Sequence, residues 1–454
     1  MSNNISSNNK RQEKPPKGIT AISVRGYKSI CDECNLEIRP LTILAGANSS
    51  GKPSVMQPLL LFKQTLEASY DPGPLLLNGP NVRFTSIEQL FSKVNAKVSS
   101  DKFTIKLEID REQVLTNTFT KHPQKRIELA QMEHRQGERT ITLRPGMTLF
   151  DVINVGTNSL KNLKKSFPQL YESAGFAETL SKKRERVSRK RCFLIFEIHA
   201  GDLGLYHLVN PSTPFEFQIR KLIHVPGLRG NPKRSYKTTA IGAEFPGTFE
   251  HYVASVVNHW QVTEDPRIRD LGNALEKLGL TWKVEARQVD DIQVELYVGR
   301  LSQGIKSGTR DIVSIADVGF GVSQILPVLV ALLAAEPEQL VYLEQPEIHL
   351  HPRAQVALAQ VLADAANRGV RVVAETHSSL LLLGVQSLVA EDKLSPDKIK
   401  LHWFKRRDDG ATEVASADLD KAGAFGDWPE DFADVALETE SRYLDAAEAR
   451  RGKQ

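Results

Sequence analysis

The sequence predicts an α/β fold built around a parallel sheet, and three segments carry this prediction. Near the N-terminus an apolar strand, LTILAG at 41–46, leads into a glycine- and serine-rich loop and then into a helix. Much later, the apolar strands QLVYL at 339–343 and VRVVA at 370–374 flank an amphipathic helix at 352–369. Strands that are joined by helices lie parallel, so we expect a ligand site at their carboxyl ends.

The composition is that of a folded globular protein. The chain has 454 residues, of which 41% are hydrophobic and 25% charged, which is enough for two or three lobes. Its longest apolar run, at 325–335, is too short to cross a bilayer, and the polar N-terminus lacks the apolar core of a secretory signal. The 3 cysteines make no disulfide framework. We therefore expect a cytoplasmic protein without membrane contact.

Changes of pattern along the chain predict five segments. Strand-like pieces at 103–110 and 192–200 enclose a basic, helix-leaning stretch, which we interpret as a helix-rich insertion between two lobes. The predicted segments are a flexible tail (1–17), an N-terminal lobe (18–100), the insertion (101–217), a C-terminal lobe (218–405) and a tail helix for partner docking (406–454).

The loop AGANSSGK at 45–52 has the spacing of a phosphate-binding P-loop, with four residues between Gly46 and Gly51 and Lys52 directly after. Glycines let backbone N–H groups turn toward phosphate oxygens, and the following helix presents its positive N-terminal end. An accidental Gly/Ser turn is disfavoured, because a strand precedes the loop and a helix follows it. We predict nucleotide contacts from Gly46, Asn48, Ser49, Ser50, Gly51, Lys52 and Ser54.

Polar residues also follow the two later strands. Glu344, Gln345 and Glu347 end the strand that begins at 339, and His377 ends the strand that begins at 370. In phosphoryl transfer a carboxylate holds the metal, a neighbouring residue orients the attacking water, and a further polar group contacts the γ-phosphate. We predict these four residues as the catalytic set.

Together with GFGVSQ at 319–324, these motifs resemble the ATP-binding-cassette (ABC) heads of SMC-like and OLD-like ATPases, over roughly 18–90 and 317–405. Within that class, GANSSGKPSVMQPLLLFKQTLE, LLLNGPNVRFTS, HVPGLRGNP and YLEQPEIHLHP resemble the PtuA ATPases of Septu-type anti-phage systems. The resemblance implies an ABC-type P-loop ATPase head that uses ATP with Mg²⁺. It also implies that the Gly/Ser signature of one subunit closes over ATP held by another.

The resemblance assigns roles to single residues. Lys52 is the phosphate lysine and His377 the switch histidine. Glu344 and Gln89 are the metal ligands, although an exposed helical glutamine is an equal alternative for Gln89. The signature residues Gly321 and Ser323 contact the γ-phosphate of the partner's ATP.

Two positions depart from the catalytic pattern. Pro53 suits the first turn of a helix but lacks the hydroxyl that should help to hold Mg²⁺, and Ser54 lies about 100° further round the helix. Gln345 stands where many such ATPases have glutamate, and an amide is no strong base. Glu347 could act instead, or be a structural acid. We therefore expect slow or absent ATP hydrolysis.

Two basic segments are candidates for contact with DNA or RNA. Lys182–Arg191 belongs to a run with seven basic residues in eleven, and Arg229–Arg234 lies in a Gly/Pro-rich loop. The alternatives are a solvated face or an acidic protein partner for the first segment, and an inter-subunit brace for the second.

These observations predict an ATP-binding subunit that forms an ATP-bridged dimer or a higher oligomer with copies of itself. By resemblance, its partner is an HNH nuclease of the PtuB type, which the subunit scaffolds and regulates in bacterial antiviral defence. The alternative is an active SMC/OLD-like ATPase of DNA repair or chromosome maintenance, which requires DNA-stimulated hydrolysis.

Overall fold

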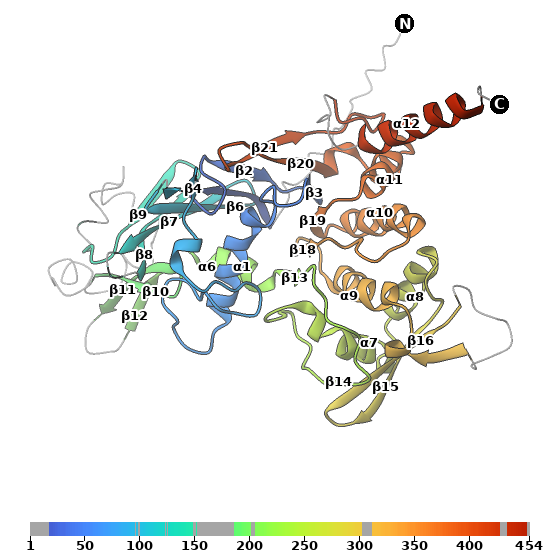
Figure 1. The fold of residues 1–454 in the computed structure, drawn as a ribbon. Coiled ribbons are helices and arrows are strands. Elements are labelled where there is room, and N and C mark those ends of the chain that lie inside the picture. The colour runs from blue at the N-terminus through green and yellow to red at the C-terminus, as the bar shows by residue number, and fades with distance from the viewer. Residues whose placement is uncertain are drawn as a thin grey trace, which may run out of the picture.

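The computed structural model describes residues 18–95, 97–98, 100–122, 124, 126–148, 151, 186–200, 205–301, 311–426 and 434–451. The predicted flexible tail (1–17) and residues 160–185 of the helix-leaning middle (160–191) of the predicted insertion lie outside these residues. The described end of that middle contains the strand Val187–Lys190, so the prediction of a helix is wrong there. Strand-rich structure from the first half of the chain lies beside helix-rich structure from the second half (Figure 1). Among the described helices, none has both the length and the apolar character that a membrane span requires.

A six-stranded sheet carries the predicted P-loop strand in its interior. Its order is β13–β18–β19–β3–β20–β21, with the first five strands parallel and β21 antiparallel to β20. The strands are β13 (Ile223–Val225), β18 (Leu340–Glu344), β19 (Arg371–Thr376), β3 (Leu41–Gly46), β20 (Ile399–Arg406) and β21 (Thr412–Ala417). The three strands predicted to be parallel are therefore neighbours, and their carboxyl ends meet at one edge.

A second sheet of six antiparallel strands, ordered β2–β1–β6–β7–β8–β9, forms most of the N-terminal half. Its strands are β1 (Ile19–Arg25), β2 (Cys34–Glu37), β6 (Lys102–Ile109), β7 (Gln113–His122), β8 (Arg126–Gln136) and β9 (Arg139–Leu143). The predicted boundary at residue 100 falls inside this sheet, because β6 pairs with β1 and places Leu107 opposite Ile22. Pairing between such distant residues leaves no local signal in the sequence.

Helix α1 (Pro53–Glu67) begins directly after the P-loop and lies between the two sheets (Figure 1). Successive side chains of β3 point to opposite faces of the sheet, so this one strand contributes to two hydrophobic cores. Leu41, Ile43 and Ala45 face the core formed with the C-terminal helices, whereas Leu44 faces the core formed with α1 and the antiparallel sheet. The C-terminal helices are α7 (Val253–Val262), α8 (Arg267–Lys277), α9 (Phe320–Ala334), α10 (Pro352–Asn367) and α11 (Ser379–Ala390).

Two arginines at the described end of the basic run, Arg189 and Arg191, bind other parts of the chain. Arg191 donates to the backbone carbonyls of Leu66 and Ala68, so it caps the C-terminal end of α1, where carbonyls lack helical partners. Arg189 forms an ion pair with Asp71 at 2.9 Å. These two cations are therefore occupied within the chain, and residues 182–185 of the predicted nucleic-acid segment lie outside the described residues.

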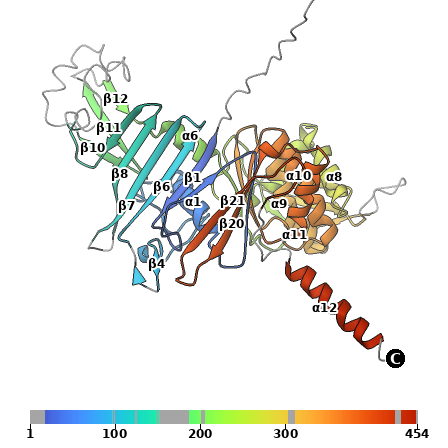
Figure 2. The same cartoon turned by 90° about the horizontal axis from the view of Figure 1, so that it is seen from above.

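The remaining elements are peripheral. One three-stranded sheet contains β10 (Val187–Lys190), β11 (Phe193–Ala200) and β12 (Leu205–Val209). A further small sheet contains β14 (Tyr236–Lys237), β15 (Val284–Asp290), β16 (Gln293–Gly299) and β17 (Ile312–Ser314), and β4 (Lys93–Val94) pairs with β5 (Lys97–Val98). Helix α6 (Thr213–Lys221) packs on α1, and helix α12 (Asp434–Arg451) projects from the body (Figure 2).

Candidate nucleotide-binding site

The P-loop has the glycine-dependent backbone that its spacing predicts. Gly51 has φ +100°, and a Cβ there would lie 2.3 Å from Thr412 Oγ1. Gly46 has φ +142°, and a Cβ there would lie 2.2 Å from the carbonyl oxygen of Phe404. Both positions therefore exclude larger residues, because the β20–β21 hairpin packs directly against the loop.

Lys52 lies at the end of the loop and is 3% exposed. Its Nζ donates to the carbonyl oxygens of Gly46 and Ala47, each at 3.0 Å. Burial lowers the pKa of this ammonium group, while the nearby carboxyl groups of Glu375 and Glu347 act in the opposite direction. The lysine is thus held at the mouth of the loop, where it can exchange carbonyl partners for phosphate oxygens.

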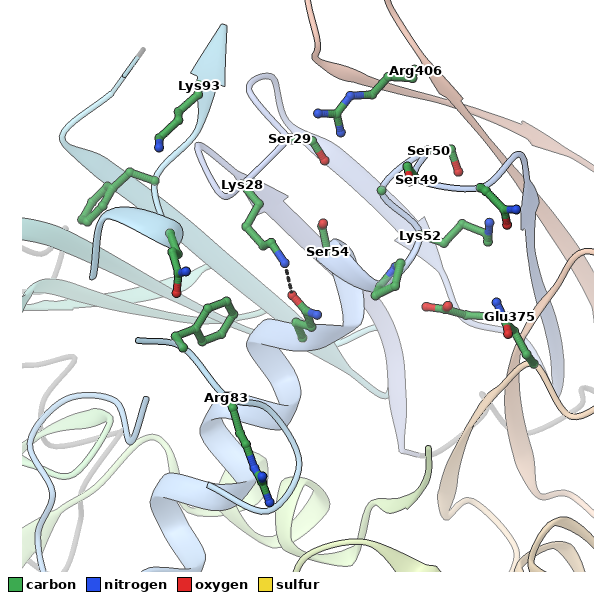
Figure 3. Close-up of a pocket in the computed structure, with 18 of the residues that line it drawn as sticks. Lys28, Ser29, Ser49, Ser50, Lys52, Ser54, Arg83, Lys93, Glu375 and Arg406 are labelled. Atoms are coloured by element: carbon green, nitrogen blue, oxygen red, sulfur yellow. Dashed lines mark hydrogen bonds between the residues drawn. The ribbon is translucent and has the colours of Figure 1, made fainter. Parts of the chain in front are cut away.

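A pocket of about 700 Å³ opens in front of the P-loop (Figure 3). It brings together P-loop residues, the N-terminal turn of α1, and residues from the ends of β18, β19 and β20. Of the predicted site residues, those that line it are Asn48, Ser49, Ser50, Gly51, Lys52, Ser54, Gln89, Gln345 and His377. Nine predicted residues from four regions of the sequence therefore face one cavity, whose volume is in the range of small-molecule sites.

Glu375 also lines the pocket, and it was not among the predicted site residues. It is the penultimate residue of β19, is 2% exposed, and accepts a hydrogen bond from the hydroxyl of Tyr342. Burial raises the pKa of Glu375 to about 8, and the charges of Glu344 and Glu347 add to this shift. A signal was present, because the alternation of β19 places Glu375 on the same face as Val373, toward α1.

Glu344 lies at the end of β18 but does not line the pocket. Asn81 Nδ2 donates to His224 Nδ1 at 3.0 Å, so His224 Nε2 carries the proton and donates to Glu344 Oε1, also at 3.0 Å. The N–H of Gly227 donates to Glu344 Oε2 at 3.0 Å. Burial alone would raise the pKa of Glu344, but these hydrogen bonds hold it below the usual value.

Glu347 turns back toward the neighbouring strand. Its Oε1 accepts from Thr376 Oγ1 at 2.7 Å and from the N–H of His377 at 3.0 Å, so it fixes the end of β19. His377 itself lines the pocket, and burial together with the charge of Lys52 lowers the pKa of its imidazole. A neutral imidazole therefore faces the cavity near neutral pH.

Gln345 reaches the pocket from a strained backbone with φ +44°. Its N–H donates to the carbonyl of Glu375 at 3.0 Å, and its own carbonyl accepts from Arg229 Nη2 at 3.0 Å. Arg229 is 7% exposed, so this part of the predicted nucleic-acid loop is buried. In the same loop, Arg234 forms an ion pair with Asp317 at 2.8 Å.

Gln89, predicted as a metal ligand or alternatively as an exposed helical glutamine, lines the pocket and is exposed. It ends a short helical turn, and its Oε1 accepts from the N–H groups of Thr85 at 3.0 Å and Ser86 at 3.4 Å. The amide oxygen, which is the atom a metal would need, is therefore part of a capping arrangement.

The signature residues do not line this pocket. Gly321 and Ser323 lie in the first turn of α9, where Ser323 Oγ donates to the carbonyl of Phe320 at 3.0 Å. Ser323 lines a separate cavity of about 110 Å³, which it shares with Arg229 and Lys233. One chain thus brings the P-loop, Gln345 and His377 together and leaves its signature at a different place.

Two family models match the chain over separate segments. The model described as "AAA ATPase domain" matches residues 18–198, and the model described as "AAA domain, putative AbiEii toxin, Type IV TA system" matches residues 210–383. A search of curated proteins finds no match.

Among solved structures, the chain is similar to heads of SMC proteins. These include an SMC head bound to the C-terminal winged-helix domain of ScpA, with 12% identity over 89% of this chain and 99% of that chain and a TM-score of 0.49. They also include the SMC head of Thermotoga maritima (10% identity, 88% and 100% covered, TM-score 0.40) and an SMC head of Pyrococcus yayanosii (11% identity, 89% and 98% covered, TM-score 0.46).

The P-loop, the two sheets on either side of α1 and the two AAA ATPase domain matches agree on one fold. The chain has an α/β fold with a P-loop, as in ATPase domains, and the pocket beside the P-loop is its candidate nucleotide-binding site.

Proposed function

We propose that the protein is the ATP-binding, oligomerising subunit of a bacterial antiviral complex, in which bound ATP joins two copies of the chain. The proposal of an ATP-bridged dimer rests on one observation: within one chain, the P-loop and the glycine-bearing signature of α9 lie at separate places. Lys52 lines the pocket, whereas Gly321 and Ser323 lie outside its lining. A glycine-bearing helix start is suited to phosphate, so the signature of α9 is available to a nucleotide held by another copy.

Mixing two inactive variants tests this arrangement. Lys52→Ala removes the phosphate lysine but keeps the signature, and Ser323→Arg blocks the signature but keeps the P-loop. We expect neither variant alone to dimerise with ATP. An equimolar mixture should form dimers, because each mixed pair retains one complete site. Sedimentation with and without ATP measures this, and a mixture that remains monomeric while the wild type dimerises contradicts the proposal.

The antiviral part of the proposal rests on the resemblance of the P-loop and acidic-strand segments to PtuA ATPases. The description of the C-terminal family model, which names a toxin of a toxin–antitoxin system, is in keeping with a role of this kind. The partner we propose is an HNH nuclease of the PtuB type, held and regulated by the ATP-bound oligomer. Co-purification of this chain with the HNH protein encoded beside it, followed by assays of nucleic-acid cleavage with and without ATP, tests the partnership.

Slow or absent hydrolysis is the remaining part of the proposal. Gln345 supplies an amide where a base is needed, and Pro53 supplies no hydroxyl. Turnover should therefore fall well below the roughly 1–100 per second of ordinary phosphoryl-transfer enzymes. Turnover within that range that DNA stimulates further would support the alternative, an SMC/OLD-like ATPase of DNA repair.

A further inference from the structure

We propose that the pocket neutralises the nucleotide's phosphates with fixed side-chain cations in place of Mg²⁺. This inference rests on the proposed ATP site and concerns its cofactor requirement. ABC-type heads use a hydroxyl from the P-loop helix, a carboxylate from the adjacent strand and a loop glutamine around the metal. In this chain each of those three positions is unsuited to metal binding.

The residue that should supply the hydroxyl is a proline in this chain. Pro53 is the first residue of α1 and has no oxygen in its side chain. Ser54 lines the pocket, but its side chain leaves the helix about 100° away from that of residue 53. A Mg²⁺ ion demands near-octahedral oxygen geometry, so a displaced hydroxyl is a poor substitute.

The other two ligand positions are occupied by hydrogen bonds. The two oxygens of Glu344 accept from His224 and from Gly227, each at 3.0 Å. Gln89 Oε1 accepts from two backbone N–H groups of its own turn. Glu344 also lies outside the pocket lining, and both lone pairs of the Gln89 amide oxygen are engaged, so neither side chain is placed to bind a metal in the cavity. The residues at these positions therefore do not fit a magnesium ion.

The P-loop supplies one cation to the pocket, Lys52, and other segments supply four more. Figure 3 shows Arg406 near the P-loop serines and Lys28 and Lys93 on the opposite side of the view, whereas Arg83 lies beside α1 with its guanidinium directed away from the P-loop. With Lys52, the cationic lining residues are Lys28, Lys52, Arg83, Lys93 and Arg406. They come from the β1–β2 turn, the P-loop, the segment at 83–93 and the end of β20.

These cations are available for a ligand. Lys28 Nζ donates to the neutral amide of Gln57 at 2.9 Å and lies over the ring of Phe84. Within the described residues, none of the five forms an ion pair within 4 Å. The lining carboxyl groups are Glu88 and Glu375, and Glu88 is paired with Lys121 at 3.3 Å.

Charge supplies the physical reason. A triphosphate carries several negative charges at neutral pH, which a bound metal normally offsets in part. Positive groups that line the cavity attract phosphate oxygens, and salt screens each of them in part because the cavity is open to solvent. A nucleotide held in this way would lack the divalent ion that phosphoryl transfer commonly uses, so the arrangement favours binding without turnover.

The test compares ATP binding by calorimetry in EDTA and in excess Mg²⁺. For the wild type we expect Kd values that agree within about threefold. In Arg83→Ala/Lys93→Ala/Arg406→Ala, Kd in EDTA should rise by at least about tenfold, equivalent to 1.4 kcal/mol. The matched control is Arg126→Ala/Arg135→Ala/Arg139→Ala, which removes three exposed cations from β8 and β9. It should change Kd by less than about twofold.

The outcomes separate this inference from the proposed function. Tight binding that EDTA abolishes overturns the inference and leaves the ATP-bridged dimer standing. Equal effects of the two triple variants also overturn it, because a general charge effect then explains the loss. A wild type that binds no ATP under either condition overturns both proposals. Thermal unfolding of each variant confirms that the substitutions leave the fold intact.

Discussion

Thr412 Oγ1 lies 2.8 Å from the backbone carbonyl of Ser50, so the first residue of β21 holds the P-loop by a hydrogen bond. The same hydroxyl lies 2.8 Å from Ser29 Oγ, and the N–H of Thr412 donates to the carbonyl of Ser29 at 2.7 Å. The conformation of the phosphate loop thus depends on a hairpin from the other end of the chain.

Replacing Thr412 with valine should weaken nucleotide binding. Valine preserves the shape but removes the donor and leaves the Ser50 carbonyl unpaired, which costs about 1–2 kcal/mol of unfolding free energy. Because the loop loses its support, we expect the Kd for ATP to rise by about three- to tenfold. Thr104→Val on β6 is the control, and equal Kd values for the two variants would contradict the prediction. Calorimetry and urea unfolding measure the two effects.

Glu375 should make stability depend on pH. The folded protein keeps this carboxyl protonated up to about pH 8, whereas the unfolded chain ionises it near the usual value of 4.5. The unfolded state therefore binds fewer protons in this window, and the free energy of unfolding should fall as pH rises from about 5 to about 8. Glu375→Gln should remove that component, which is on the order of a few kcal/mol. Urea unfolding of both proteins between pH 5 and pH 9 measures it, and parallel curves would refute the assignment.

Arg191 should stabilise α1 from its C-terminal end. Its guanidinium donates to the carbonyls of Thr65, Leu66 and Ala68, which have no helical partners. Arg191→Ala should lower the free energy of unfolding by about 1–3 kcal/mol, because charged donors to part-buried carbonyls are lost, although Arg220 still donates to that of Leu66. Lys190→Ala, an exposed neighbour, should cost less than about 0.5 kcal/mol. The prediction fails if thermal unfolding gives the same midpoint for both variants.

Restoring the two departing catalytic positions should create turnover. Pro53→Ser returns a hydroxyl beside the P-loop, and Gln345→Glu returns a carboxylate to the lining of the pocket. We expect the double variant to hydrolyse ATP at least about tenfold faster than the wild type, with or without Mg²⁺, since acid–base catalysis alone contributes on the order of 10²–10⁴-fold. Adding Lys52→Ala should abolish the gain. A double variant as slow as the wild type would mean that other groups limit hydrolysis.

The sequence by itself determined the parallel strands, the P-loop and nine of the residues that line the pocket. Each depends on a local pattern: an apolar strand, a fixed glycine spacing, or polar residues at a strand end. The P-loop conformation follows from Gly46 and Gly51, whose positive φ values suit glycine. The departures at Pro53 and Gln345 could also be predicted from the sequence, because the missing hydroxyl and the amide follow directly from the identity of each residue.

Only the tertiary structure decided how those residues are used. In the folded chain Glu344 accepts a hydrogen bond from His224, and the Gln89 amide oxygen accepts from the backbone of its own helical turn. Glu375 lines the cavity. The tertiary structure also joined β6 to β1 in one sheet and gathered Lys28, Arg83 and Arg406 around one pocket. Hydrogen-bond partners and shared cavities depend on contacts between residues far apart in the chain, and local spacing carries no record of those contacts.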